Sequence, residues 1–187
     1  WGRAADGHQI RTSGTTSTLA TTDTPGNTNF ILSPNFPGDW HSPENSNLWQ
    51  GINGVNNPCP AGYRVPTETE WNAEKSSWSS NNAQGAYTGV LRLTLAGRRN
   101  HSNGNLGAVG TQGVYWTSTA TGLYSQKFNI SDVDALTISE GRATGLSLRC
   151  IKEPIGTIGY LNCDGASISG SVIEGDEASN ISASVPY

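Results

Sequence analysis

The stretch NPCPAGYRVPTETEW, residues 57–71, places one sharply delimited helix start directly after a cysteine. Thr67 is a good N-cap residue and Glu70 stands three positions later, so each side chain can satisfy the backbone N–H of the other in a capping box. Trp71 and Trp78 are seven residues apart and lie on one face of a helix. We therefore expect a helix from this cap to about residue 78.

The residues after this helix show the short alternating runs that are typical of β-strands. Leu91, Leu93 and Leu95 alternate with polar residues, which predicts a strand with one apolar face. Four further runs, separated by Gly or Asp turns, are residues 114–119, 123–130, 135–141 and 144–153. Their regular spacing is typical of an antiparallel meander, so one helix and this sheet together predict an α+β fold.

The two ends of the chain differ from this central pattern. Residues 1–57 are rich in turn formers and show no helical period. Residues 155–187 contain no Trp, Lys or Arg and are rich in Ser, Gly and acidic residues. We expect residues 1–153 to form one domain, and residues 154–187 to form a linker or the start of a following β-rich module.

The composition limits the partners and the compartment of the protein. Charged residues make up 14% of the chain and the net charge is −4, so no basic surface is expected for nucleic acid. No apolar run approaches the roughly 18 residues of a membrane span. Low charge with much Ser, Thr, Asn and Gly suggests an extracellular or cell-surface protein, in which a disulfide is permitted. The chain has no Met and opens at Trp1, so we expect a processed product or a section of a longer protein.

Four motifs, in order, resemble a known family. They are WGRAADGHQIR at the start, NPCPAGYRVPTETEWNAE, YWTST and GLSLRCIKE. This combination is similar to the Fibrobacter succinogenes major paralogous domain, which occurs in large secreted and surface proteins of Bacteroidota, including adhesin-like proteins. The segment YRVPTETEWNAE is also similar to a motif of the formylglycine-generating enzyme group.

The resemblance implies a C-type-lectin-like fold. Such a fold has one or two helices, a twisted antiparallel sheet and long irregular loops. The family's domains start with a strand before the Trp-Gly-Arg motif, so we expect the sheet here to lack that strand. We also expect a disulfide between Cys59 and Cys150, which leaves Cys163 unpaired or paired with a cysteine beyond this chain.

Enzymatic activity is not expected. Formylglycine-generating enzymes bind copper with two close cysteines, and this chain has no match to that pair. His8 and His41 lie near aspartates, but no Gly-x-Ser-x-Gly nucleophile motif accompanies them. No cofactor is expected, with calcium as the one ion to consider. Asp132 and Asp134 are spaced like the first half of a calcium loop, but the Gly and final Glu of such a loop are missing, and the alternative is a solvated turn between strands.

A binding role is the function that we expect. Lectin-like scaffolds carry function on their loops, and Trp40, Trp49, Tyr87 and Trp116 are candidates for stacking on a sugar or another ligand. The alternative is that these tryptophans fill the core. We expect a non-catalytic extracellular module of a large bacterial surface protein, acting in adhesion or surface-fibre assembly. Its partners would be a glycan or protein ligand, or copies of itself. The alternatives are a carbohydrate-binding module and a degenerate formylglycine-generating-enzyme-like enzyme.

Overall fold

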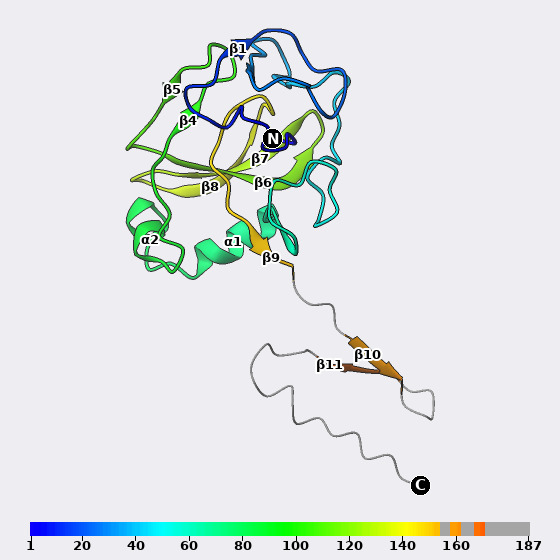
Figure 1. The fold of residues 1–187 in the computed structure, drawn as a ribbon. Helices are drawn as coiled ribbons and strands as arrows, with labels where there is room; N and C mark the ends of the chain where they lie inside the picture. Colours follow the sequence, from blue (N-terminus) through cyan, green and yellow to red (C-terminus); the bar gives the residue numbers. More distant parts are fainter. Residues whose placement is uncertain (154–157, 162–166, 171–187) are drawn as a thin grey trace. The chain divides into compact units, whose positions relative to one another are not determined.

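The computed structural model describes residues 1–153, 158–161 and 167–170 (Figure 1). The chain divides into two units, Trp1–Lys152 and Glu153–Tyr187. Within the first unit, two helices accompany several small sheets, so the predicted α+β class is confirmed. Neither of these helices is long and apolar enough to cross a membrane.

The largest sheet has three antiparallel strands in the order β6-β7-β8. They are β6 (Gly113–Thr121), β7 (Tyr124–Ile130) and β8 (Ala135–Glu140), close to the expected runs. Phe128 of β7 pairs with Tyr115 of β6 and Thr137 of β8, which sets the register. A shift of register between Trp116 and Ala120 interrupts the pairing of β6 with β7.

Strand β6 separates two hydrophobic clusters. Successive side chains of a strand point to opposite faces, so Tyr115 packs in one cluster and Trp116 in the other. The Tyr115 cluster includes Trp71 of the first helix, whereas the Trp116 cluster includes Trp1, Trp40 and Trp49 of the N-terminal loops. In Figure 1 the helices accordingly lie on one side of the sheet and the N-terminal loops on the other.

Helix α1 (Glu68–Ser76) begins where the sequence predicted. Thr67 is its N-cap, and the reciprocal hydrogen bonds between Thr67 and Glu70 form the expected capping box. The helix ends at Ser76, two residues before the expected end. Trp71 and Trp78 nevertheless both contact Phe128, and their ring centroids lie 5.1 and 5.7 Å from that of Phe128. The shared apolar face is therefore confirmed.

Helix α2 (Ala83–Thr88) is a second, short helix whose position the sequence analysis did not predict. The Asn82 side chain caps it by accepting hydrogen bonds from the backbone N–H groups of Gln84 and Gly85. Gly85 is buried, and a Cβ there would lie 1.8 Å from the Ser80 carbonyl oxygen. Glycine is therefore required for the chain to turn tightly into this helix.

The remaining strands are two to four residues long. They are β1 (Thr15–Thr16), β2 (Phe30–Ile31), β3 (Tyr63–Arg64), β4 (Arg98–Arg99), β5 (Leu106–Gly107), β9 (Ile151–Lys152), β10 (Ile158–Leu161) and β11 (Ser167–Gly170). Strands β1 and β2 pair in parallel, whereas β3 with β9, β4 with β5, and β10 with β11 pair antiparallel. The β10–β11 pair is the described part of the predicted C-terminal β-rich tail, and Cys163 lies outside the described residues.

One of the predicted strands is wrong, and another is confirmed only in part. Residues 91–95 form no strand, because Arg92 has a positive φ of 49° that interrupts an extended run, and Leu91 is exposed while Leu93 is buried. Within 144–153, regular pairing is limited to β9, and residues 145–148 follow β6 through hydrogen bonds of Ser147 with Val114 and Trp116. Alternating leucines therefore reflect partial burial here, not a strand.

A disulfide joins Cys59 and Cys150, as the family resemblance implied. Their Cα atoms are 5.8 Å apart and their sequence separation is 91. The bridge lies beside the β3–β9 pair, in which Tyr63 faces Lys152 and Arg64 faces Ile151. The entry to α1 and the end of the first unit are therefore tied together by a covalent bond and a short β-ladder.

Removal of this disulfide is expected to lower the free energy of unfolding by about 3–5 kcal/mol, because the bridge closes a long loop in the unfolded chain. The change is Cys59→Ser with Cys150→Ser, made in a Cys163→Ser background. Urea denaturation followed by tryptophan fluorescence measures it, with Cys163→Ser alone as the control. An unchanged denaturation midpoint would contradict the structural role of the bridge.

The capping box predicts a dependence of stability on pH. Bidentate hydrogen bonds from Arg64, at 2.7 and 2.8 Å, lower the pKa of Glu70 to about 2, and bonds from Thr67 act in the same direction. Because the pKa of Glu70 is lower in the folded protein than its ordinary value of 4.5, the ionised carboxylate stabilises the fold above pH 4.5. This contribution is lost as the pH falls towards 2. We expect Glu70→Gln to cost about 1 kcal/mol at pH 7, and progressively less between pH 4.5 and 2. Denaturation at several pH values measures this, with the exposed Glu44→Gln as the control, and a difference that stays constant over this range would contradict it.

Candidate binding cavity

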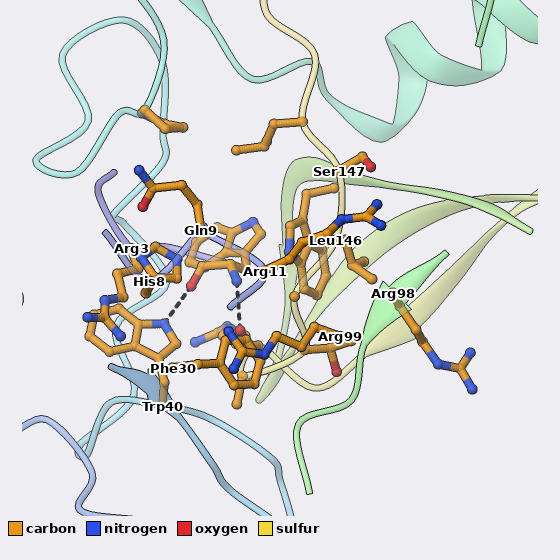
Figure 2. A pocket seen from close by; sticks show the side chains of 18 of the residues that line it. Arg3, His8, Gln9, Arg11, Phe30, Trp40, Arg98, Arg99, Leu146 and Ser147 are labelled. Carbon is orange, nitrogen blue, oxygen red and sulfur yellow. Dashed lines mark hydrogen bonds between the residues drawn. The ribbon is translucent and has the colours of Figure 1, made fainter. Parts of the chain in front are cut away.

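A cavity of about 390 Å³ lies beside the Trp116 face of β6. Its walls come from segments far apart in the sequence, chiefly residues 1–11, 30–31, 40–49, 96–99 and 142–148. Its volume is within the range of cavities that hold small molecules. Figure 2 shows the side chains that surround it.

Tryptophans form the inner wall of this cavity. Trp1, Trp40, Trp49 and Trp116 all line it and belong to one hydrophobic cluster. The Trp1 indole donates to the Thr117 carbonyl at 2.9 Å, and the Trp40 indole donates to the Trp1 carbonyl at 2.5 Å. These bonds fix the two rings, because a buried indole N–H needs an acceptor.

The expected exposed stacking surface is wrong. Trp40 and Trp49 are 3% exposed and Trp116 is 2% exposed, whereas stacking on a sugar needs an open ring face. The chain has few large aliphatic residues, and its tryptophans fill the core in their place. The ligand-binding role of these three residues stays a prediction, and they would contact a ligand as part of the cavity wall. Tyr87 is 56% exposed and is not part of the cavity lining.

Two of the lining arginines, Arg142 and Arg3, are each held by several hydrogen bonds within the protein. Arg142 is 1% exposed and bonds to Asp39 at 3.4 Å, to two serine hydroxyls and to two carbonyls. Arg3 bonds to Asp6 at 2.7 Å and to the carbonyls of Asn27 and Asn29. Arg3 thus crosslinks N-terminal loops, and Arg142 joins loop residues to the start of β7.

Arg99 of β4 is buried without a carboxylate partner among the described residues. Its guanidinium donates to Ser13 and to the carbonyls of Ile10 and Gly104, and it lies 4.3 Å from the centre of the Phe30 ring. Burial lowers the pKa of Arg99, although an arginine remains charged at neutral pH. It therefore leaves a positive charge at the cavity wall.

Arg11 and Arg98 also line the cavity and have no carboxylate partner in the described part of the chain. Arg11 is exposed, and one of its N–H groups donates to the Ala96 carbonyl at 3.1 Å. Figure 2 shows Arg11 among the side chains around the cavity, whereas the Arg98 guanidinium points away from them. Neither position was identified from the sequence.

His8 borders the cavity as a neutral side chain. Burial lowers the pKa of His8 to about 4, and a hydrogen bond with Asp6 at 2.8 Å opposes this shift only in part. With Nδ1 donating to the Asp6 carboxylate, Nε2 is the acceptor of the ring. His8 thus adds no positive charge near neutral pH.

The proposed calcium residues lie in the turn between β7 and β8. Ser131 donates to the Asp134 carboxylate at 2.8 Å and accepts the backbone N–H groups of Val133 and Asp134, and Asp132 is exposed. This is the solvated turn that was the alternative. In the part of the chain that the structure describes, no group of three or more His, Cys, Asp or Glu is placed to hold a metal ion.

The cavity could not be found from sequence motifs, because its lining residues extend from Trp1 to Leu148. The arginines were the one signal in the sequence, because the chain has only 11 basic residues. The sequence does not show which arginines are buried, so it does not show which of them line a cavity.

Comparisons with known proteins give no relative: no family model matches the chain, and neither a search of curated proteins nor a search of solved structures finds a match. The resemblance to the Fibrobacter succinogenes major paralogous domain and the lectin-like scaffold therefore stay expectations.

The structural role of Arg142 leads to a prediction. Arg142→Met should lower the free energy of unfolding by about 3–5 kcal/mol, because it leaves the buried Asp39 carboxylate without its partner. The exposed Arg149→Met is the matched control and should change stability by less than about 0.5 kcal/mol. Chemical denaturation measures both, and equal effects would contradict this role.

Proposed function

We propose that this chain is a non-catalytic extracellular module of a large bacterial surface protein, acting in adhesion or surface-fibre assembly, and that it holds its target at the cavity described above. The observation that carries the proposal is the construction of the cavity. Loops that are held by Arg3, Arg99 and Arg142 frame a space with four tryptophans on its inner wall, within a unit closed by a disulfide. Ligand-binding loops on a rigid scaffold have this arrangement.

The titratable groups at the cavity favour holding a ligand over reacting with it. Three arginines are committed to bonds within the protein. His8 has a pKa of about 4, far below neutral pH, which makes it a weak proton acceptor for general base catalysis there. Cys59 and Cys150 are joined, so neither offers a thiolate for the copper chemistry of a formylglycine-generating enzyme.

A carbohydrate-binding module is the second candidate. In its favour, four tryptophans line the cavity. Against it, the three tryptophans expected to stack on sugars are at most 3% exposed. A glycan array tests this candidate, because a carbohydrate-binding module would bind a defined set of glycans, and a chain that binds proteins or itself but no glycan is not one.

The proposal predicts binding that depends on the cavity. The immobilised chain is tested against arrays of glycans and of extracellular proteins, and light scattering tests whether it associates with itself. Ser147 lies on the cavity wall and its backbone bonds do not involve its side chain, so Ser147→Trp should fill part of the cavity and reduce target binding at least about tenfold.

The matched control is Ser17→Trp, which adds the same ring at an exposed position outside the cavity lining. Circular dichroism and thermal unfolding confirm that both variants fold. If neither array gives a ligand and the chain does not self-associate, or if Ser147→Trp binds as well as Ser17→Trp, the proposal is wrong.

A further inference from the structure

We infer that the cavity accepts a small organic carboxylate with a flat apolar body, whose carboxylate pairs with Arg11 while its body packs against the aromatic wall. This inference rests on the proposed binding function and names the ligand class of the same site. It is drawn from the charges around the cavity, from the free donors there and from the character of its walls.

The charge at the cavity is opposite to that of the whole chain. The chain carries a net charge of −4, yet the lining contains five arginines and no aspartate or glutamate: Arg3, Arg11, Arg98, Arg99 and Arg142. Asp6 and Asp39 neutralise two of these arginines. Three positive charges therefore remain around one cavity, and in this partly dry space they attract an anion.

Arg11 is the arginine that is placed to contact the anion. It makes one hydrogen bond through Nη2 in the described part of the chain, whereas a guanidinium has five N–H donors in a planar fork. The fork matches the two oxygens of a carboxylate. Arg99 is committed to protein acceptors, and the Arg98 guanidinium points away (Figure 2).

The backbone around the cavity favours a carboxylate over a phosphate. Phosphate sites commonly use several free backbone N–H groups. Here the N–H groups of Ala143, Gly145 and Ser147 donate to protein carbonyls, as does that of Gly97. A planar anion with one negative charge, held by one guanidinium, is the better match to the donors that remain.

The walls favour an apolar body over a sugar. A sugar ring needs several hydrogen-bonding partners, and two polar atoms of the lining are already used: Gln9 Oε1 accepts from Gly7, and the Thr144 hydroxyl donates to Glu140. Apolar lining is plentiful, with Phe30, Leu146 and Leu148 beside the tryptophans.

The test compares 3-phenylpropionate with 3-phenylpropionamide, which has the same body without the charge, and with acetate, which has the charge without the body. Isothermal titration calorimetry with the full 187-residue chain gives the affinities. We expect 3-phenylpropionate to bind at least about tenfold more tightly than either of the other two. Arg11→Gln should remove the preference for the carboxylate over the amide.

Comparing Arg11→Gln with Arg98→Gln distinguishes direct contact between Arg11 and the ligand from long-range attraction of the ligand by positive charge. Arg98→Gln removes the same charge from a side chain directed away from the cavity, and it should weaken binding less than Arg11→Gln, by an amount that shrinks with added salt. Arg92→Gln removes an exposed charge outside the cavity lining and is the control. The inference is overturned if acid and amide bind equally, if Arg98→Gln costs as much as Arg11→Gln, or if methyl glucuronoside binds and 3-phenylpropionate does not.

Failure of this inference is distinguishable from failure of the proposed function. If the chain binds an array target but does not bind 3-phenylpropionate, the proposed function stands and the inferred ligand class is wrong. If 3-phenylpropionate binds with the Arg11 dependence but no target is found on either array and the chain does not self-associate, the ligand class stands and the role in adhesion or fibre assembly falls.

Discussion

The structure of the first unit depends on the burial of both faces of strand β6. Tyr115 and Trp116 are neighbours in sequence and point to opposite sides, so one strand supplies a large aromatic ring to each of two clusters. Helix α1 packs on one face through Trp71, whose indole donates to the Trp116 carbonyl at 3.2 Å. The loops pack on the other face, and the cavity wall follows from their arrangement around Trp116.

In the loops, arginine side chains supply hydrogen bonds to the backbone that neighbouring strands would supply in a larger sheet. Irregular segments leave backbone carbonyls without partners, and a buried carbonyl needs a donor. Arg3, Arg99 and Arg142 supply several donors each, and every one of them bonds residues that are far apart in the sequence. The same three residues line the cavity, and Arg99, whose charge no carboxylate of the described residues neutralises, contributes to its positive charge.

Much of the fold could be predicted where the pattern is local. The capping box at Thr67 and Glu70 and the three strands of the main sheet follow from short-range periodicity. The strand predicted at residues 91–95 was wrong, because the alternation of apolar and polar residues does not reveal the positive φ of Arg92. It also missed α2, since six residues with Gln, Gly and Thr carry no helical period.

The sequence by itself determined the α+β class and the start of α1, because these depend on neighbouring residues, whereas the pairing of Cys59 with Cys150 was expected only from the family resemblance. Only the tertiary structure decided that Trp40, Trp49 and Trp116 are buried and that Arg11 lies beside the same cavity as Arg99. Burial and proximity depend on contacts between segments separated by tens of residues, and no local pattern encodes which loop covers which face of a sheet.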